Sequence, residues 1–145
     1  MKRYFLIFIG LTVSALFLLS ACKEKLTSVV ESAYDDGTPQ KVLYYKTENG
    51  KKILVKSAEY YPNHQPYIEG GYKDGEREGE WKSWYDNGNL WSVGTFKAGV
   101  SVGETKTYHE NGSLNYSGAY DENGKRTGTW KFYDKDSNLL ETIDY

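Results

Sequence analysis

The chain of 145 residues has few of the residue types that crosslink a protein, bind metals or perform catalysis. It contains one cysteine, one methionine, three prolines and two histidines. A disulfide needs two cysteines, so none can form within the chain, and stability must come from packing and backbone pairing. The histidines, His64 and His109, fall in expected hairpin turns or at strand ends, without a repeating acidic partner. The sequence has no nucleophile–base constellation, so we expect no enzyme, no cofactor and no metal site.

The longest apolar run of the chain lies at its start. Lys2 and Arg3 precede an apolar stretch over residues 5–19, which is too short to span a bilayer as a stable helix. The stretch ends in Leu19-Ser20-Ala21-Cys22, which resembles the signal of bacterial lipoproteins. That resemblance implies a signal peptide over residues 1–21 and a mature N-terminus at Cys22 that carries acyl chains such as palmitate. The alternative is an ordinary secretory signal, which would leave the only cysteine as a free thiol.

The lipoprotein signal implies a location in the bacterial cell envelope, with the chain anchored to a membrane through Cys22. Residues 22–30 are expected to form a short tether, and Lys23-Glu24 fits part of a signal for export to the cell surface. The mature chain carries 16 basic and 20 acidic side chains, a net charge of −4. This charge disfavours nucleic acid and anionic lipid headgroups as partners.

One segment of about twelve residues recurs along the chain. Residues 79–90 return as residues 103–114 and again as residues 128–139, at a period of 24 or 25 residues. A fixed period of this size is typical of a chain built from one small unit that stacks on its neighbours. Stacked units usually present a binding surface, and they rarely enclose a pocket for chemistry.

Each unit reads as two antiparallel strands. Alternating aromatic and polar residues flank Asn87-Gly88 and Asn111-Gly112, and Asn-Gly between alternating runs is a strong hairpin signal because both residues accept positive φ. A period of 24 residues holds two strands and two loops and leaves no room for a helix. The expected strand pairs are residues 81–86 with 90–97, 105–110 with 114–120, and 130–134 with 139–145.

Two weaker copies precede the clear ones. Tyr60–Pro66 aligns 24 residues before Trp84–Leu90, and a more diverged copy begins at Tyr34. Pro62 and Pro66 cannot donate to a strand ladder, so we expect an irregular turn there. The sequence therefore predicts an all-β fold over residues 31–145, an elongated single-layer antiparallel sheet of successive hairpins.

The pattern Gly-x-Trp-Lys-x-Trp/Tyr-x-x-Asn-Gly-x-Leu, followed by Gly-x-Phe/Tyr, resembles the MORN repeat in its bacterial variant. The resemblance covers roughly Tyr34 to Tyr145 and is clear over Gly79 to Leu139. It implies an elongated sheet of hairpins, and the family is associated with protein scaffolding and with lipid headgroups. Some bacterial members carry an antitoxin label. The chain departs from the pattern in its first two units and in its last turn, which lacks the glycine.

Residues that recur in every unit are expected to be scaffold, and residues that occur once are the better candidates for binding. The glycine of each return strand leaves room for an aromatic ring from a neighbouring strand. Trp91 and Val93 have Asn115 and Ser117 as their counterparts in the next unit, so this apolar pair is the first binding candidate. From the recurring aromatic column, Trp84 and Tyr108 complete the candidate set.

Two acidic stretches have ordinary explanations. Residues 134–138 begin like a calcium loop, but Leu139 and Tyr145 stand where such a loop needs Gly and Glu. The segment aligns with a hairpin turn, which explains it without a metal. Residues 74–80 form the densest acidic run and read as a solvated loop, with a weak cation site as the alternative.

These features favour a membrane-anchored module that binds or scaffolds another protein in the cell envelope. A carbohydrate or cell-wall binder that uses Trp and Tyr as stacking platforms is the second hypothesis, with a glycan as partner. An antitoxin or immunity-type inhibitor is the third, although the export signal argues against a cytoplasmic target.

Overall fold

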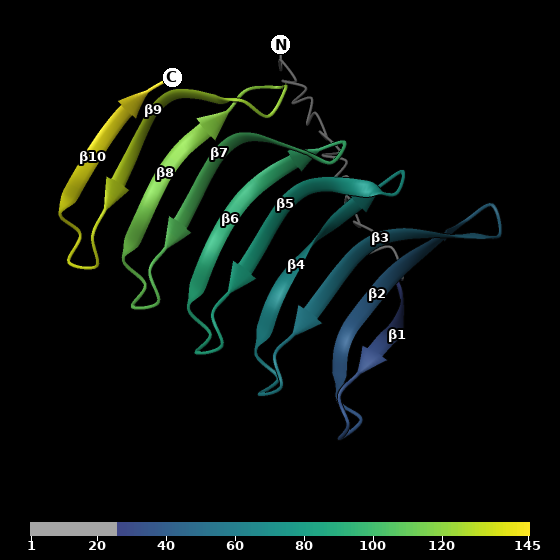
Figure 1. Cartoon of the computed structure of the whole chain (residues 1–145). Helices are drawn as coiled ribbons and strands as arrows, with labels where there is room; N and C mark the ends of the chain where they lie inside the picture. Colours follow the sequence, from purple (N-terminus) through teal and green to yellow (C-terminus); the bar gives the residue numbers. More distant parts are fainter. Residues whose placement is uncertain (1–25) are drawn as a thin grey trace, which may run out of the picture.

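The computed structural model describes residues 26–145, which form one open antiparallel sheet of ten strands (Figure 1). Strand order in the sheet follows chain order, so each strand pairs with its neighbours in sequence. The strands are β1 (Thr27–Ala33), β2 (Pro39–Glu48), β3 (Lys51–Tyr60), β4 (Pro66–Lys73), β5 (Glu76–Trp84), β6 (Leu90–Lys97), β7 (Val100–Tyr108), β8 (Leu114–Tyr120), β9 (Arg126–Tyr133) and β10 (Leu139–Asp144). The predicted all-β sheet of successive hairpins is confirmed.

The predicted signal peptide over residues 1–21 and the lipidation site Cys22 lie outside the described residues. Strand β1 begins at Thr27, within the segment 22–30 that the sequence suggested as a tether. The diverged first copies form paired strands like the later ones, because β2 pairs with β1 and β3, and β4 pairs with β3 and β5. Within residues 26–145, no helix is long and apolar enough to cross a membrane.

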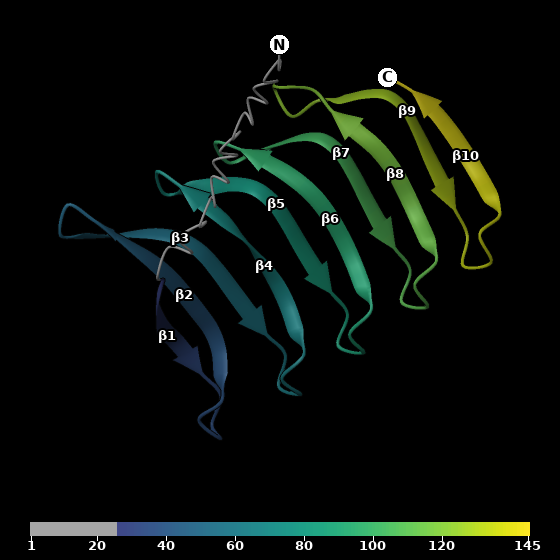
Figure 2. The same cartoon turned by 180° about the vertical axis from the view of Figure 1, so that it is seen from behind.

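The turns line up along the two edges of the sheet, which Figure 2 shows from behind. In the turn between β5 and β6, the Tyr85 N–H donates to the Asn89 carbonyl, and the Gly88 N–H donates to the Tyr85 carbonyl. Gly88 has a φ of +86°, whereas Asn87 is not among the residues with positive φ. The prediction that both residues of this Asn-Gly pair take positive φ is therefore wrong. The hairpin has a three-residue loop, which needs only one left-handed residue.

The role of Asn87 in that turn is a hydrogen bond and not a special backbone angle. Its Oδ1 accepts the Asn89 N–H at 2.9 Å, which fixes the chain where it leaves the turn. Asn63 and Asn111 accept the equivalent N–H in their own turns, at 3.1 Å in both cases. An Asx turn of this kind explains why asparagine recurs before glycine.

The turn that contains Pro62 is regular, which corrects the expectation of an irregular one. It has the same two backbone hydrogen bonds as the Tyr85 turn, from Tyr61 to Gln65 and from His64 to Tyr61. Pro62 follows Tyr61 directly, at a turn position where its fixed φ is favourable and no N–H is needed. His64 takes the left-handed position with a φ of +67°.

The turns with two left-handed residues are three of the four that join one repeat unit to the next; the β8–β9 turn has only Gly124 in that conformation. Asn49-Gly50, Asp74-Gly75 and Ala98-Gly99 all have positive φ at both residues. They join β2 to β3, β4 to β5 and β6 to β7, as two-residue hairpin loops. Ala98 pays a steric cost at a φ of +48°, which Gly or Asn would avoid.

The glycine that opens each clear unit lies in a β-bulge. Gly79 and Gly103 have φ of +75° and +67°, and the registers of β4–β5 and β6–β7 shift where these residues lie. Gly128 has a φ of +63° at the register shift of β8–β9. Bulges bend and twist a strand locally. The strands accordingly curve over in their upper part (Figure 1).

The most buried part of the sheet consists of two tryptophans, each packed against a glycine of the neighbouring strand. Trp130 is fully buried, and Trp81 is 5% exposed. A Cβ built on Gly118 would lie 2.2 Å from Trp130 Cδ2, and one built on Gly70 would lie 2.1 Å from Trp81 Cδ2. Each indole therefore occupies the space that a side chain on the neighbouring strand would need. The expectation that the return-strand glycine makes room for a ring is confirmed at Gly70 and Gly118 but not at Gly94, which meets only Thr105.

Successive repeats are also linked by side chains at the end of the sheet where the turns within the repeats lie, which we call the turn edge. In each case a ring donates to a backbone carbonyl of the following repeat. The four bonds are Tyr34 to Tyr60 at 2.6 Å, Tyr61 to Trp84 at 2.8 Å, Tyr85 to Tyr108 at 2.9 Å, and His109 Nε2 to Tyr133 at 2.9 Å. A carbonyl only accepts, so His109 must carry a proton on Nε2. His109 thus has the place of a tyrosine in this series, which we call the carbonyl ladder.

The glycine–tryptophan contact predicts that alanine substitution lowers the stability of the fold much more at Gly118 than at Gly94, although the two glycines have the same place in their repeats. Gly118→Ala would push a Cβ into the Trp130 ring and should destabilise the fold by about 3 kcal/mol. Gly94→Ala meets only Thr105 Oγ1, at 3.3 Å, and should change stability by less than about 1 kcal/mol. Urea unfolding of both variants measures the difference, and equal losses would contradict the close contact.

The carbonyl ladder predicts a cost for removing a single hydroxyl. Tyr85→Phe leaves the Tyr108 carbonyl without its ring donor and should destabilise the chain by about 1 kcal/mol. Tyr67→Phe is the matched control, because its ring is 36% exposed and no hydrogen bond of its hydroxyl is found within residues 26–145. We expect the control to stay within about 0.5 kcal/mol of the parent chain. Thermal unfolding of the two variants side by side is the measurement, and equal midpoints would refute the ladder.

Candidate binding surfaces

The register of the strands divides the side chains between two faces. Residues directly opposite each other on paired strands share a face. One row across the sheet runs Gly70, Trp81, Gly94, Thr105, Gly118. We call the side of this row the aromatic face. The other row runs Glu69, Lys82, Val93, Lys106, Ser117, Lys131, and we call its side the charged face.

On the aromatic face, each buried tryptophan lies between two rings from beyond the bulge. Trp81 has Tyr72 at 5.4 Å and Phe96 at 6.1 Å between ring centroids, both edge to face. Trp130 has Tyr120 at 5.1 Å and Tyr145 at 6.1 Å in the same arrangement. These four rings succeed one another at 24 or 25 residues and form one column. Since rings from beyond the bulge cover the indoles, the aromatic face is the inner side of the bend.

An arginine covers each indole from the same side. The Arg77 guanidinium carbon is 4.1 Å from the centroid of the Trp81 ring, and that of Arg126 is 4.6 Å from the Trp130 ring. Stacked guanidinium groups of this kind stabilise the pair electrostatically while they shield the ring. The Arg126 guanidinium also donates to the Tyr145 hydroxyl at 2.6 Å, and this bond raises the pKa of Arg126. The first and third clear repeats are therefore closed over their tryptophans.

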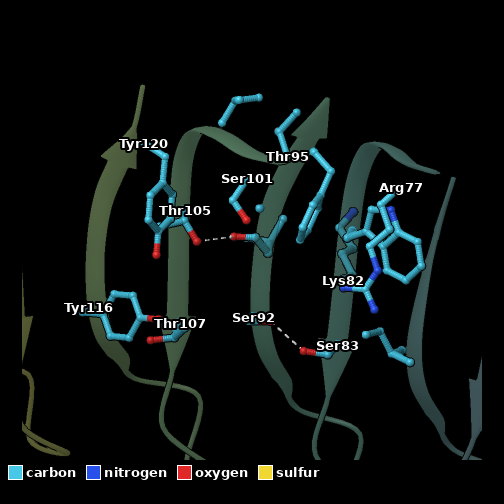
Figure 3. Close-up of a pocket in the computed structure, with 16 residues that line it drawn as sticks. Arg77, Lys82, Ser83, Ser92, Thr95, Ser101, Thr105, Thr107, Tyr116 and Tyr120 are labelled. Carbon is cyan, nitrogen blue, oxygen red and sulfur yellow. Dashed lines mark hydrogen bonds between the residues drawn. The ribbon is translucent and has the colours of Figure 1, made fainter. Parts of the chain in front are cut away.

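The middle repeat is open at the same place. Thr105 stands where its neighbours have Trp81 and Trp130, and Ser101 stands where they have Arg77 and Arg126. Figure 3 shows Thr105 and Ser101 on β7, between Tyr120 on β8 and Arg77 on β5. A cavity of about 180 Å³ lies at this point. Its walls include Phe96 and Tyr120, and we call it the middle-repeat cavity.

The floor of this cavity carries hydroxyl groups. Ser83 Oγ and Ser92 Oγ are 2.6 Å apart, and Thr105 Oγ1 donates to the Val93 carbonyl at 3.3 Å. Thr107 is 7% exposed, and its buried Oγ1 has no hydrogen-bond partner in the described part of the chain. Thr107 lies beside Tyr116 in Figure 3. A buried hydroxyl without a partner costs free energy, so this one marks an incompletely satisfied site.

The charged face is open to solvent and carries two ion pairs on β3 to β5. Lys56 Nζ is 2.7 Å from Glu69 Oε2, and Lys82 Nζ is 2.6 Å from Glu80 Oε1. The bond to Glu80 raises the pKa of Lys82, but both side chains are well exposed and add little to stability.

The two residues of the predicted pair Trp91 and Val93 have different surroundings. Val93 lies between Lys82 and Lys106 on the charged face. Trp91 falls in the register shift between β5 and β6 and has no Cα partner. Its ring is 42% exposed and lies 6.1 Å from Tyr85 at the turn edge. The aromatic at this position recurs, because Tyr67 takes the same place beside Tyr61, at 5.1 Å between centroids.

Trp84 and Tyr108 belong to the strand ends at the same edge. Their carbonyls accept the ladder bonds from Tyr61 and Tyr85. In the earlier copy, Tyr60 has the same place in the repeat, and burial raises the pKa of its phenol to about 12, with a further contribution from a hydrogen bond to Tyr44. The backbone of Trp84 and Tyr108 is therefore part of the carbonyl ladder, and a binding role for their side chains stays a prediction.

The segment 134–138 is a turn, as expected, but the acidic run 74–80 is not a loop, because residues 76–80 belong to β5. Asp134 Oδ1 accepts the N–H groups of Asp136 and Asn138 at 2.9 and 2.8 Å, and the hydrogen bonds from Asn138 lower the pKa of Asp134. Glu78 Oε2, on β5, accepts the N–H of Ala98 in the β6–β7 turn at 3.0 Å. Within residues 26–145, no group of three His, Cys, Asp or Glu side chains is placed to hold a metal ion.

Sequence reasoning did not find the middle-repeat cavity. The signal was present, because aligning Trp81, Thr105 and Trp130 shows one small residue between two large ones. The small residue at Thr105 is informative only together with Gly94, because this position is a glycine although no tryptophan ring lies against it. Only the strand register, which places Gly94 opposite Thr105, connects the two observations.

No curated protein is significantly similar to the chain in sequence. Among solved structures, the crystal structure of TarM is 18% identical, with a TM-score of 0.46 over 82% of this chain and 21% of that chain. A mutant TarM from S. aureus, crystallised with Fondaparinux, alpha-GlcNAc-glycerol and UDP, is 15% identical, with a TM-score of 0.34 over 84% and 20%. A GtfA/B complex bound to UDP and GlcNAc is 8% identical, with a TM-score of 0.29 over 70% and 22%. The chain spans about a fifth of their lengths, and these likenesses carry no functional argument.

The family model for the MORN repeat variant matches three segments of the chain, residues 77–98, 101–122 and 126–145. Each segment spans one hairpin, β5–β6, β7–β8 and β9–β10 in turn. The matches begin after the two diverged copies, which have the same strand topology without the sequence pattern. The three clear repeats of this chain are therefore matches to the MORN repeat variant.

Proposed function

We propose that the chain is a lipid-anchored module of the bacterial cell envelope whose open sheet binds another protein. The observation that carries the binding role is the middle-repeat cavity, which opens the aromatic face between two repeats that are closed over their tryptophans. Rings and hydroxyl groups line this cavity. Interface centres on proteins are rich in aromatic residues and arginine, as this face is.

The proposed anchor comes from the sequence alone. Leu19-Ser20-Ala21-Cys22 is the motif that would place acyl chains on the new N-terminus. Only a few residues separate Cys22 from β1, which begins at Thr27. The sheet would therefore be held close to the membrane surface, where a partner in the envelope can reach it.

A carbohydrate or cell-wall ligand is the second candidate, and exposed ring pairs at the turn edge favour it. Trp91 beside Tyr85 and Tyr67 beside Tyr61 repeat the same arrangement one unit apart. Trp91 and Tyr67 are 42% and 36% exposed. Exposed rings at a regular spacing could stack on successive sugar rings.

The proposed anchor predicts the mass of the mature protein. Protein extracted from membranes should begin at Cys22 and carry acyl chains, and Cys22→Ser should carry none. Intact-mass spectrometry of both chains, after growth with a labelled fatty acid, tests this. A membrane-extracted protein that begins at another residue, or that has a free thiol, would refute the anchor.

Two binding experiments on the mature protein distinguish a protein partner from a carbohydrate ligand. Crosslinking in intact cells followed by mass spectrometry should identify a protein partner, and a glycan array should show no binding. If instead the array shows binding that Trp91→Ala reduces by about tenfold or more, the carbohydrate hypothesis replaces ours, since one lost stacking contact costs roughly 1.4 kcal/mol at this ratio. Trp91→Ala should fold normally, because the ring is largely exposed.

A further inference from the structure

The middle repeat lacks two side chains that the repeats on both sides have. Trp81 and Trp130 each carry a stacked arginine, and the corresponding positions of β7 hold Thr105 and Ser101. The same strand geometry surrounds all three positions, because Tyr72, Phe96 and Tyr120 pair with Arg77, Ser101 and Arg126 in turn. The cavity is thus the space of an indole and a guanidinium that the chain does not supply.

The floor for an indole is still present in the middle repeat. Gly70 and Gly118 are glycines because a Cβ at either would lie 2.1 or 2.2 Å from an indole atom. Gly94 has no such ring on it and meets only Thr105 Oγ1, at 3.3 Å from the Cβ position. By contrast, Ser57, which also aligns with Trp81, lies opposite Leu43 and Gly70, and Leu43 offers no such floor.

The walls for an indole are present too. Phe96 and Tyr120 flank the cavity, and they belong to the same column as the rings that flank Trp81 and Trp130. Phe96 already contacts Trp81 edge to face, and Tyr120 contacts Trp130 in the same way. A ring over Gly94 would make this alternation of rings continuous from Tyr72 to Tyr145.

The cavity also has the polar group that an indole needs. Trp81 Nε1 donates to the Gly71 carbonyl at 3.1 Å, and Trp130 Nε1 donates to the Ala119 carbonyl at 3.2 Å. The equivalent carbonyl is that of Thr95, a residue of the cavity wall. Thr107, also in the wall, adds a hydroxyl that is more than nine-tenths buried and unpartnered within the described residues.

The volume of the cavity suits a ring of this size. An apolar cavity of about 150 Å³ in another protein is large enough to bind benzene. The middle-repeat cavity measures about 180 Å³ and is open on one side, so a bicyclic ring could enter without a change in the sheet.

We propose that the middle-repeat cavity receives a tryptophan side chain of the partner protein, with a cationic side chain of the same partner beside it. The indole lies on Gly94 between Phe96 and Tyr120, and its N–H donates to the Thr95 carbonyl. The cation takes the place opened by Ser101 and stacks on the indole, as Arg77 does on Trp81. This inference rests on the proposed function, because it names the chemistry by which the partner protein is recognised.

The first test uses small probes on the full mature chain with Cys22→Ser, followed by NMR. N-acetyltryptophanamide at millimolar concentration should shift the amide signals of Gly94 and Thr105 in a saturable way. The 1-methyl derivative, which has no indole N–H, should bind several-fold more weakly. No shift at these residues, or equal binding of both probes, would overturn the proposal.

Two variants close the cavity in different ways. Thr105→Trp fills it with the indole of the chain itself, should raise the thermal midpoint, and should abolish probe binding. Gly94→Ala blocks only the floor and should also abolish binding while the chain stays folded, because its Cβ meets only the Thr105 side chain, which has to shift by a few tenths of an ångström. Thr142→Trp, opposite Lys131 on the charged face, adds an indole elsewhere and should leave probe binding unchanged. Probe binding that survives Thr105→Trp or Gly94→Ala would overturn the proposal.

The same variants separate this inference from the proposed function. Crosslinking in intact cells with Thr105→Trp should lose the partner that the parent chain and Thr142→Trp both capture. A partner that Thr105→Trp still captures would refute the tryptophan-binding role and leave the protein-binding module standing. The absence of any captured protein would refute the module itself.

Discussion

The fold depends on the close contact of an indole with a glycine across two strands. A single-layer sheet has no second layer, so its own side chains must bury one another. Trp130 reaches complete burial because Gly118 gives it the space next to the backbone and the bent strand ends bring Tyr120, Arg126 and Tyr145 over it. An aromatic side chain of this size is worth roughly 4–6 kcal/mol as an upper bound from the area it buries.

The bend that makes this burial possible comes from the bulges at the head of each repeat. Gly79 and Gly128 take left-handed backbone angles there, and the strand beyond them turns over the aromatic face. Along the opposite edge, the carbonyl ladder joins each turn to the next repeat. Both devices act between neighbours only, so each repeat depends on the adjacent ones and not on a common core. Such an architecture tolerates a departure in one repeat, and the middle repeat has one.

The sequence predicted the sheet, its strands and its turns because each depends on local chemistry. Alternation and Asn-Gly located the hairpins, and the repeat period gave their order. The turn type was missed because Asn87 caps the turn through its side chain, a role that the dipeptide alone does not reveal. The turn at Pro62 was expected to be irregular, whereas the residue sits where its ring is favourable and its missing N–H is not needed.

The site was harder to predict than the fold because the cavity arises where the middle repeat has no tryptophan, at Thr105. Trp91 was singled out for its lack of a counterpart in the next unit, yet Tyr67 has the same place in the preceding one. Thr105 looked like ordinary variation, since a small polar residue in a strand has no special meaning. Its significance needs the register that places it over Gly94, and the flanking repeats that show what the space normally holds.

The central claim is that the middle repeat has every group that surrounds an indole in its neighbours, namely the glycine, the two flanking rings and the carbonyl acceptor, but has no indole of its own. Nuclear Overhauser effects in Thr105→Trp test this directly. The account predicts contacts from the new indole to the α-protons of Gly94 and to the rings of Phe96 and Tyr120, with an indole N–H protected from exchange. A new indole that exchanges freely with solvent and shows none of these contacts would contradict it.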